Sequence, residues 1–505
     1  MNKKNSRKNK FVYNTIASIT NQIMLIISGF VIPKYMLSFY GSEINGLVSS
    51  ISQFLGFISF MQAGVGVVVQ AALYDPINRD DWIKVSEIYK SAQRFFRTIA
   101  YIFIGYTLFV SIVYPIITKT PFSNTYVFAL VWVISINLFS QFYFSITNTL
   151  LLNADQKAYV SLGISTIMVI LNIIVSTALM YLECDILMMK LFSNIVCLFS
   201  PISITIYVQK NYPLNRKITY DSEPIKQKWS GFAQHISAVI VDNTDIIVLT
   251  IFSTLTNVSI YSVYYMVVSA IKQLLISFTG GIQSLFGSML AKKEEEKLYN
   301  TFNMFELIFS WITTFMFSTT ITLIVPFIRV YTLEIKDANY EKPVFAVLLS
   351  LAFAIFCYRT IYYTLIKAAG HFKETQTGAI IEVIINLLVS ITLVKRIGLL
   401  GVAIGTCLAV SYRTIYCVWY LSHNLIKRPM LLFFKNMFIN VLAYTICIWL
   451  GHNFNIKEYT YLSWIILAIK QSIINLIIIF ILYMLFYRGK MLHAVKILLK
   501  RNKKV

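Results

Sequence analysis

Long apolar stretches recur along the whole chain and are separated by short polar breaks. A helix of about 20 mostly apolar residues is long enough to cross the hydrocarbon core of a bilayer. The pattern contains roughly fourteen such stretches. They begin near Phe11, Ile44, Phe95, Asn124, Lys157, Asp185, Gly231, Val258, Thr301, Pro343, Thr375, Gly398, Leu431 and Tyr461. The pattern therefore predicts an all-α polytopic membrane protein with about fourteen transmembrane helices.

Composition narrows the possible functions. Of the 505 residues, 57% are hydrophobic and 13% are charged, whereas soluble domains carry about 25% charged residues. No loop is longer than about twenty residues, and the chain contains no Walker A, HExxH, GxSxG or CxxC motif. A multi-span glycosyltransferase or ligase usually needs a large domain or loop outside the bilayer for its chemistry, so we expect a protein that is not an enzyme and uses no metal or cofactor.

The basic residues are distributed unevenly between the polar breaks. The formal net charge is +22, and about thirty of the Lys and Arg residues fall in the breaks that lie on the N-terminal side of the membrane. This is the positive-inside pattern, so both basic termini are predicted to be cytoplasmic, where they can also meet anionic lipid headgroups. A nucleic-acid partner is the poorer interpretation of this charge.

An internal repeat is present. LLNADQKAYVSLGISTIMVILNIIVSTAL (Leu151 to Leu179) aligns without gaps with LIKAAGHFKETQTGAIIEVIINLLVSITL (Leu365 to Leu393), and polar Asn and Ser coincide along with the apolar residues. The offset of about 215 residues spans six predicted helices, an even number, so both halves have the same orientation. Two pseudo-symmetric six-helix bundles followed by a C-terminal helix pair account for all the predicted spans.

These patterns give a domain organisation with six parts. They are a cytoplasmic basic N-terminus (1–10), a first six-helix bundle (11–209), a cytoplasmic linker (210–230), a second six-helix bundle (231–421), helices 13 and 14 (431–487) and a cytoplasmic basic tail (488–505).

Acidic and imidazole groups interrupt the seventh predicted span. FAQHISAVIVDNTDIIVLTIF carries His235, Asp242 and Asp245 on one side of the helix. A His two turns from an Asp can titrate near physiological pH. These groups are candidates for ion coupling or for tuning the charge of a site.

Three cations in the second half lie at a common predicted depth. Lys272, Arg359 and Arg413 are each about fifteen residues, or roughly 22 Å, from the outer end of their helices. An ionised side chain at midplane costs about 2.5 to 3.5 kcal/mol on insertion scales, so these groups must face a hydrated cavity or one another. Two interpretations stay open: internal ion pairs, for instance between Arg359 and Asp242 or Asp245, or a pathway for substrate or ions. Glu382 lies closer to the cytoplasmic end and is a further candidate.

The first predicted helix is polar without being charged. Asn14, Ser18 and Asn21 recur at helical spacing. Small polar residues commonly mediate close helix packing. The alternative is an uncharged cavity wall that offers hydrogen bonds to a hydroxyl-rich cargo, with Asn14 and Asn21 as substrate contacts.

Several segments resemble a known family. FYGSEINGLVSSISQFLGFISFMQAGVGVVVQAALYDPI (Phe39 to Ile77), DIIVLTIFSTLTNVSIYSVYYMV (Asp245 to Val267), IKAAGHFKETQ and IGLLGVAIGT are similar to bacterial polysaccharide flippases of the Wzx type. These belong to the multidrug/oligosaccharidyl-lipid/polysaccharide exporter (MOP) superfamily. Where that family often has Lys after the Gly of a cytoplasmic AGK loop, this chain has His371.

The resemblance implies a function in the bacterial plasma (inner) membrane. It implies that undecaprenyl-diphosphate-linked oligosaccharide is moved from the cytoplasmic to the outer leaflet by alternating access, for capsular, exopolysaccharide or O-antigen synthesis. Lys272, Arg359 and Arg413 would then attract the anionic headgroup, and membrane lipids and polysaccharide polymerase machinery would be partners. The alternatives are an ion-coupled multidrug exporter, a lipid-II-type flippase, and a non-transporting scaffold of a polysaccharide synthase complex.

Overall fold

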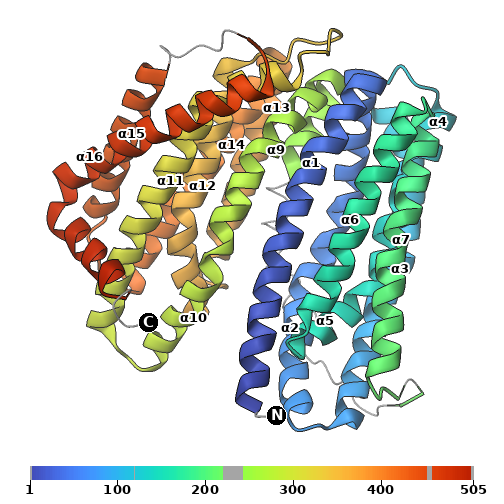
Figure 1. The fold of residues 1–505 in the computed structure, drawn as a ribbon, viewed down its shortest axis with the longest axis horizontal. Helices are drawn as coiled ribbons and strands as arrows, with labels where there is room; N and C mark the ends of the chain where they lie inside the picture. Colours follow the sequence, from blue (N-terminus) through green and yellow to red (C-terminus); the bar gives the residue numbers. More distant parts are fainter. Residues whose placement is uncertain (1–2, 119, 216, 220–242, 452–457, 502–505) are drawn as a thin grey trace. The chain divides into compact units, whose positions relative to one another are not determined.

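Helices make up all the regular structure in the described part of the chain (Figure 1). The computed structural model describes residues 3–118, 120–215, 217–219, 243–451 and 458–501. Within these residues, twelve helices are long and apolar enough to cross a membrane. The predicted all-α, multi-pass architecture is therefore confirmed at this level.

The chain divides into two compact units, Met1–Ser259 and Ile260–Val505. The helices of the first unit are α1 (Lys3–Gly56), the 3-10 segment η1 (Phe57–Ser59), α2 (Phe60–Asn78), α3 (Trp82–Ile117), α4 (Asn124–Ser140), the π-helical segment η2 (Gln141–Ser145), α5 (Ile146–Ala154), α6 (Ala158–Tyr181) and α7 (Ile186–Asn211). A short helical segment, Asn243–Phe252, follows.

Eight helices follow in the rest of the described residues. They are α9 (Leu255–Ser277), which begins just before the boundary between the units, α10 (Thr279–Ala291), α11 (Glu295–Tyr331), α12 (Pro343–Ala368), α13 (Gln376–Ile397), α14 (Leu399–Asn424), α15 (Leu431–Gly451) and α16 (Tyr461–Arg501).

The number of spans differs from the predicted fourteen for two visible reasons. The first two predicted spans are joined and count as one, Val12–Ser59. Most of this stretch is α1, which is kinked at Gly41, where φ is 79° and ψ is 176°. Glycine adopts this positive φ without the steric cost that other residues meet. Most of the seventh predicted span, from Gly231, lies outside the described residues. The total of fourteen, the pseudo-symmetry and the domain boundaries stay predictions.

Polar side chains in the connecting loops fix where several helices begin. The Asp81 carboxylate accepts a hydrogen bond from the backbone N–H of Lys84 at 3.0 Å, and Asp185 accepts one from Leu187 at 2.8 Å. A side chain of this kind satisfies a backbone donor that has no partner inside the helix, which contributes about 1 kcal/mol. The helix α7 therefore begins where the sequence pattern predicts a start, near Asp185, whereas α3 begins at Trp82, before the predicted start of the apolar span near Phe95.

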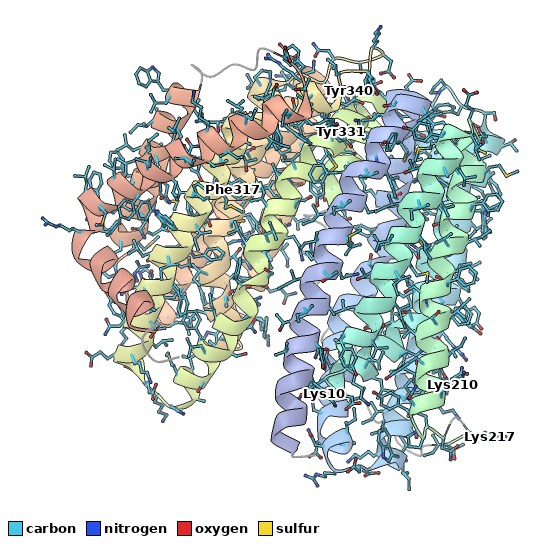
Figure 2. The ribbon with its side chains drawn as sticks, in the orientation of Figure 1. Lys10, Lys210, Lys217, Phe317, Tyr331 and Tyr340 are labelled. Atoms are coloured by element: carbon cyan, nitrogen blue, oxygen red, sulfur yellow. The ribbon has the colours of Figure 1, made fainter. Side chains whose placement is uncertain are left out.

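The first unit is built around α3 and the pair formed by α1 and α6. Phe96, Phe103 and Tyr114 of α3 are fully buried, and α1 runs along α6, which in turn packs on α7. Lys10, Lys210 and Lys217 lie at the same end of this unit (Figure 2). That end is the one predicted to be cytoplasmic.

In the second unit, α14 lies in close contact with α12 and α13. A Cβ atom on Gly405 would come within 2.2 Å of the Ser390 hydroxyl oxygen, and one on Gly401 within 2.5 Å of the Leu393 carbonyl carbon. Glycine at these two positions lets the helices approach closely, as is common between membrane helices. The C-terminal helices α15 and α16 pack on α11.

Candidate functional site

Asn14 and Asn21, predicted as substrate contacts, join α1 to α6. The Asn14 amide donates to the Gln156 carbonyl oxygen at 2.9 Å, and its oxygen accepts from the Tyr159 backbone N–H at 2.8 Å. Asn21 donates to the Thr166 hydroxyl at 3.2 Å and is 6% exposed. Both amides therefore have hydrogen-bonding partners between the two helices, and neither lines the cavity of this unit.

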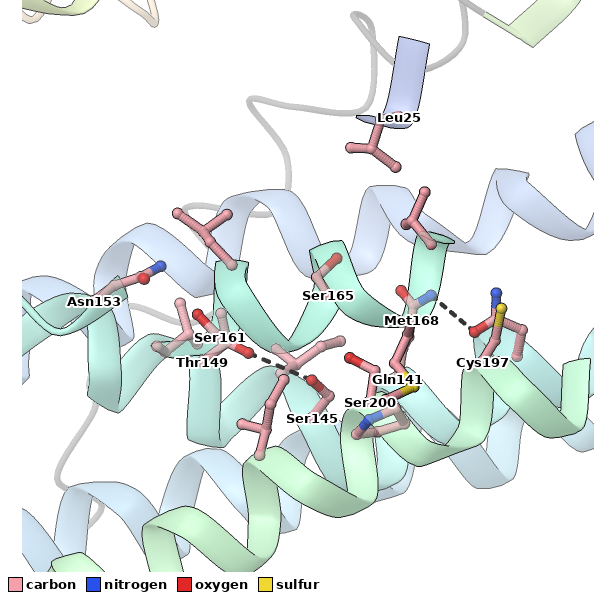
Figure 3. A pocket seen from close by; sticks show the side chains of 17 residues that line it. Leu25, Gln141, Ser145, Thr149, Asn153, Ser161, Ser165, Met168, Cys197 and Ser200 are labelled. Atoms are coloured by element: carbon pink, nitrogen blue, oxygen red, sulfur yellow. Dashed lines mark hydrogen bonds between the residues drawn. The ribbon is translucent and has the colours of Figure 1, made fainter. Parts of the chain in front are cut away.

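The first unit contains a cavity of about 480 Å³, which is within the range of about 300 to 1,000 Å³ that is typical of ligand sites. Its walls come from α4, η2, α5, α6 and α7, with Leu25 as the contribution of α1 (Figure 3). The polar residues of the lining carry only amides, hydroxyls and a thiol, and they are Asn137, Gln141, Ser145, Thr149, Asn153, Ser161, Ser165, Cys197 and Ser200.

Among the described residues that line this cavity there is no Asp, Glu, Lys, Arg or His. Amides and hydroxyls both donate and accept hydrogen bonds, so the cavity suits a polar guest without net charge. The sequence predicted an uncharged polar wall on the first helix, with Asn14 and Asn21. The polar residues of this cavity come instead from α4, η2, α5, α6 and α7.

Two of the predicted cations meet at a shared carboxylate in the second unit. Arg359 of α12 donates to Glu382 of α13, with 2.5 Å between Nη1 and Oε1. Arg413 of α14 approaches the other oxygen, with 3.7 Å between Nε and Oε2. All three side chains are buried, with 5 to 9% of each residue exposed. Internal ion pairing, one of the two interpretations left open by the sequence, is therefore present for Arg359, and Glu382 supplies the carboxylate.

Arg413 reaches this group by crossing α13 at a glycine. Its Nη1 donates to the Thr375 carbonyl oxygen at 2.8 Å. A Cβ on Gly378 would lie 2.4 Å from that nitrogen and 2.6 Å from the Tyr416 ring. Any larger residue at position 378 would displace the guanidinium group.

Lys272 of α9 lies beside the same group. Its ammonium is 4.3 Å from the centre of the Phe356 ring, and the Arg359 guanidinium is 4.6 Å from that ring. Cation–π contacts of this kind stabilise a desolvated cation. The structure thus brings together Lys272, Arg359, Arg413 and Glu382, which we call the cationic group.

The three groups of the seventh predicted span are placed only in part. Asp245 lies on Asn243–Phe252 in the first unit and is 5% exposed. His235 and Asp242 lie outside the described residues. Their proposed role in ion coupling stays a prediction.

A second buried ion pair was missed by the sequence reasoning. Glu306 of α11 accepts hydrogen bonds from Arg428, in the loop between α14 and α15, and from Tyr362 of α12. Arg428 also donates to the Tyr362 hydroxyl at 3.0 Å. The one feature in the sequence that could have indicated this pair is Glu306 itself, an acidic residue within the apolar run of α11. Arg428 resembled an ordinary cytoplasmic loop residue, so nothing in the sequence linked the two.

Hydroxyl and amide groups tie α15 and α16 to the second unit near this pair. The Tyr483 hydroxyl of α16 donates to Asn440 of α15 at 2.7 Å, and Asn440 also accepts from Thr314 of α11 at 3.0 Å. The Tyr358 and Tyr444 hydroxyls lie 2.7 Å apart. Among the described residues, no group of His, Cys, Asp and Glu is arranged to hold a metal ion.

Comparison with known proteins identifies the fold. No family model matches the sequence, and no curated protein is similar to it. A lipid II flippase MurJ structure, in an inward closed conformation, superposes with a TM-score of 0.71 at 15% identity, covering 94% of this chain and 99% of that one. An inward-facing multidrug resistance MATE transporter gives 0.64 at 13% identity, covering 80% and 96%.

A third match is a MOP superfamily transporter from Pyrococcus furiosus, with a TM-score of 0.58 at 12% identity that covers 84% of this chain and 97% of that one. That protein is described as having a binding pocket of reversed polarity. These structural neighbours are transporters and flippases, not enzymes. The chain is a multi-pass membrane protein with the fold of MOP superfamily transporters.

Proposed function

We propose that this protein is a flippase for undecaprenyl-diphosphate-linked oligosaccharide. It moves repeat units from the cytoplasmic to the outer leaflet of the bacterial inner membrane by alternating access, and supplies capsular, exopolysaccharide or O-antigen synthesis. Both termini lie in the cytoplasm. The polymerase that uses the translocated lipid is the expected partner.

The cavity of the first unit is the observation that carries this proposal. A lipid-linked oligosaccharide brings many hydroxyl groups into the membrane, and each buried hydroxyl needs a hydrogen-bonding partner. The cavity of about 480 Å³ offers neutral amides and hydroxyls, and the described residues that line it include no charged one. Drug exporters that carry cations would need acidic groups there, so the lining favours a saccharide over a cationic drug.

The cationic group is the proposed partner of the diphosphate. Lys272, Arg359 and Arg413 supply three positive charges, against one carboxylate from Glu382. Arginine binds phosphate through paired, charge-assisted hydrogen bonds. In this proposal Glu382 holds the guanidinium groups when no substrate is bound, and Asp245, Asp242 and His235 tune the charge or carry the coupling ion.

A lipid-II-type flippase is the second candidate. The MurJ structure covers 94% of this chain, whereas the MATE structure covers 80%. The same cationic and polar groups would serve a diphosphate-linked peptidoglycan precursor. A multidrug exporter is a further outcome of the test below.

The test is the leaflet distribution of lipid-linked saccharides in host cells. Cells with the intact gene are compared with a deletion strain and with strains that carry Arg359→Ala or, as a matched control, Arg329→Ala. Arg329 forms a half-exposed ion pair with Glu341 at 2.9 Å, and such pairs contribute little. Membrane abundance of each variant is measured in parallel.

We expect undecaprenyl-linked oligosaccharide to accumulate on the cytoplasmic side in the deletion and Arg359→Ala strains, and not in the control. Accumulation of lipid II alone would instead support the second candidate. An unchanged distribution together with new sensitivity to cationic dyes would identify a drug exporter. Normal transport in the Arg359→Ala strain would show that the cationic group is not needed for translocation.

A further inference from the structure

Five polar residues of the first unit's cavity lie four residues apart along one continuous helical path. Asn137, Gln141, Ser145, Thr149 and Asn153 follow α4, η2 and α5 in turn. Figure 3 shows the last four of them along this path, with Ser161, Ser165 and Ser200 around them. We call these five residues the polar track.

The π-helical segment explains how the polar track can face one cavity. In an ideal α-helix each step of four residues turns the side chain by about 40° beyond a full turn, so four steps would turn it by about 160°. A π-helical turn contains more residues and takes up part of this rotation. The segment η2 (Gln141–Ser145) lies in the middle of the track, and such segments are frequent at functional sites.

The side chains of the track have hydrogen-bonding capacity to spare. Gln141 donates to Asn137 at 3.2 Å, and the Ser145 and Thr149 hydroxyls are 3.4 Å apart. Each amide and hydroxyl can form further bonds beyond these. All five side chains are half-buried or exposed toward the cavity space, so they are accessible to a guest.

We infer that the polar track is a subsite for the uncharged sugars of the lipid-linked oligosaccharide, including N-acetylated sugars, and that it discriminates against sugars that carry a carboxylate. This inference rests on the flippase function proposed above. Sugar hydroxyls and acetamido groups donate and accept hydrogen bonds, as the track does. A sugar carboxylate only accepts, and its charge would be desolvated among residues that include no cation.

The cationic group belongs to the second unit and is not part of this subsite. Its members come from α9, α12, α13 and α14, and none of them is among the residues that line the cavity. Lys190 of α7 lies within electrostatic range of Cys197, which lines the cavity, but Lys190 itself is not among the lining residues. A carboxylate in the cavity would therefore contact amides and hydroxyls, and no charged side chain among the described residues that line it. Whether a substrate is accepted would then depend on where its negative charge lies, on the diphosphate or on a sugar, and not only on its net charge.

The experiment compares two substrates on the full-length protein in proteoliposomes. One is undecaprenyl-diphosphate carrying a disaccharide of N-acetylglucosamine, and the other is the same lipid with glucuronic acid as its terminal sugar. We expect the neutral lipid to be translocated about tenfold faster or more, because an unpaired buried polar or charged group costs at least that factor.

Two charge substitutions provide the test of the subsite. Gln141→Arg introduces a cation into the polar track. It is expected to reduce or reverse the preference for the neutral lipid over the lipid that carries glucuronic acid. Gln70→Arg is the matched control, because Gln70 lies on α2, bonds to the Tyr74 hydroxyl at 2.8 Å and does not line the cavity. Equal translocation of the two lipids by the wild type, or a preference that Gln141→Arg leaves unchanged, overturns the inference and leaves the flippase function standing.

Translocation of neither lipid by the wild type would defeat the flippase proposal, so binding is measured separately. Calorimetry on the detergent-purified protein uses chitotriose, a neutral sugar without lipid or phosphate. Binding that is lost in Gln141→Arg and kept in Gln70→Arg supports the subsite. Absence of chitotriose binding to the wild type overturns it.

Discussion

At the residue scale, the chemistry of the second unit centres on Glu382. One carboxylate accepts from Arg359 and lies near Arg413, and all three side chains are buried. Removing one partner of a buried ion pair leaves an uncompensated charge in a low-dielectric setting, which costs about 3 to 5 kcal/mol. Glu382 is therefore expected to stabilise this unit whether or not the arginines bind substrate.

Replacing Glu382 by Gln should lower the thermal unfolding midpoint of the purified protein clearly, because two guanidinium groups would lose their carboxylate. Glu382→Asp should recover part of the loss. The matched control is Glu341→Gln, which breaks the half-exposed pair with Arg329 and should change the midpoint little. Equal midpoints for Glu382→Gln and the control would contradict the interpretation. The measurement is a melting curve in detergent.

At the element scale, one carboxylate connects three parts of the first unit. Asp155 lies in the turn between α5 and α6 and accepts from Lys10 of α1, from Lys157 at 2.8 Å, and from the hydroxyl of Tyr212, just after α7, at 2.6 Å. Burial acts to raise the pKa of Asp155. Hydrogen bonds from Lys157 and Tyr212, with the charges of Lys157 and Lys10, outweigh burial and hold that pKa below its ordinary value.

This lowered pKa sets the sign of a pH dependence. A carboxyl group whose folded pKa is below its unfolded pKa contributes stability above the unfolded value, and the contribution is lost as pH falls through the folded value. The difference in unfolding midpoint between wild type and Asp155→Asn should therefore be constant from pH 7 down to about pH 5 and shrink below about pH 4. A difference that stays the same at pH 3 would show that Asp155 acts without its charge.

Two asparagines that the sequence alignment pairs lie between neighbouring helices in the structure. Asn172 of α6 accepts a hydrogen bond from Ser193 of α7 at 2.6 Å, and Asn386 of α13 donates to Thr406 of α14 at 3.1 Å. The sequence alignment pairs these two asparagines. Each therefore joins its helix to the following one, as two related halves would require, although the symmetry of the whole molecule stays a prediction.

At the scale of the whole molecule, charge and hydropathy determine the orientation in the membrane. The turn between α10 and α11 contains Lys292 and Lys293, and the loop between α11 and α12 contains Lys336. The helix α11 is long and apolar enough to cross the bilayer, so these loops are predicted to lie on opposite sides. The positive-inside rule places the first of them in the cytoplasm.

Cysteine accessibility tests this topology. In a cysteine-free background, Lys336→Cys should react with a membrane-impermeant maleimide in intact cells, and Lys292→Cys should react only after the cells are permeabilised. Labelling of Lys292→Cys in intact cells would reverse the predicted orientation. Labelling of both positions would show that α11 does not cross the membrane.

Much of the fold followed from sequence, because the bilayer makes hydropathy a strong signal. Every span needs a long apolar run, so helix positions could be read from the chain, and the predicted start near Asp185 agrees with the start of α7 at Ile186. Hydropathy does not indicate how closely two helices approach each other. The glycines that admit Arg413 and the close approach of α14 to α13 could be interpreted only with both helices in place.

The sequence by itself determined that this is an all-helical, multi-pass protein and which residues carry charge within its spans. Only the tertiary structure decided how these groups are used. Glu382 and Arg359 are 23 positions apart, Glu306 and Arg428 are 122 apart, and the polar track is brought onto one cavity by a π-helical segment. Partners so distant in sequence are chosen by helix packing, which a local pattern of apolar and polar residues does not specify.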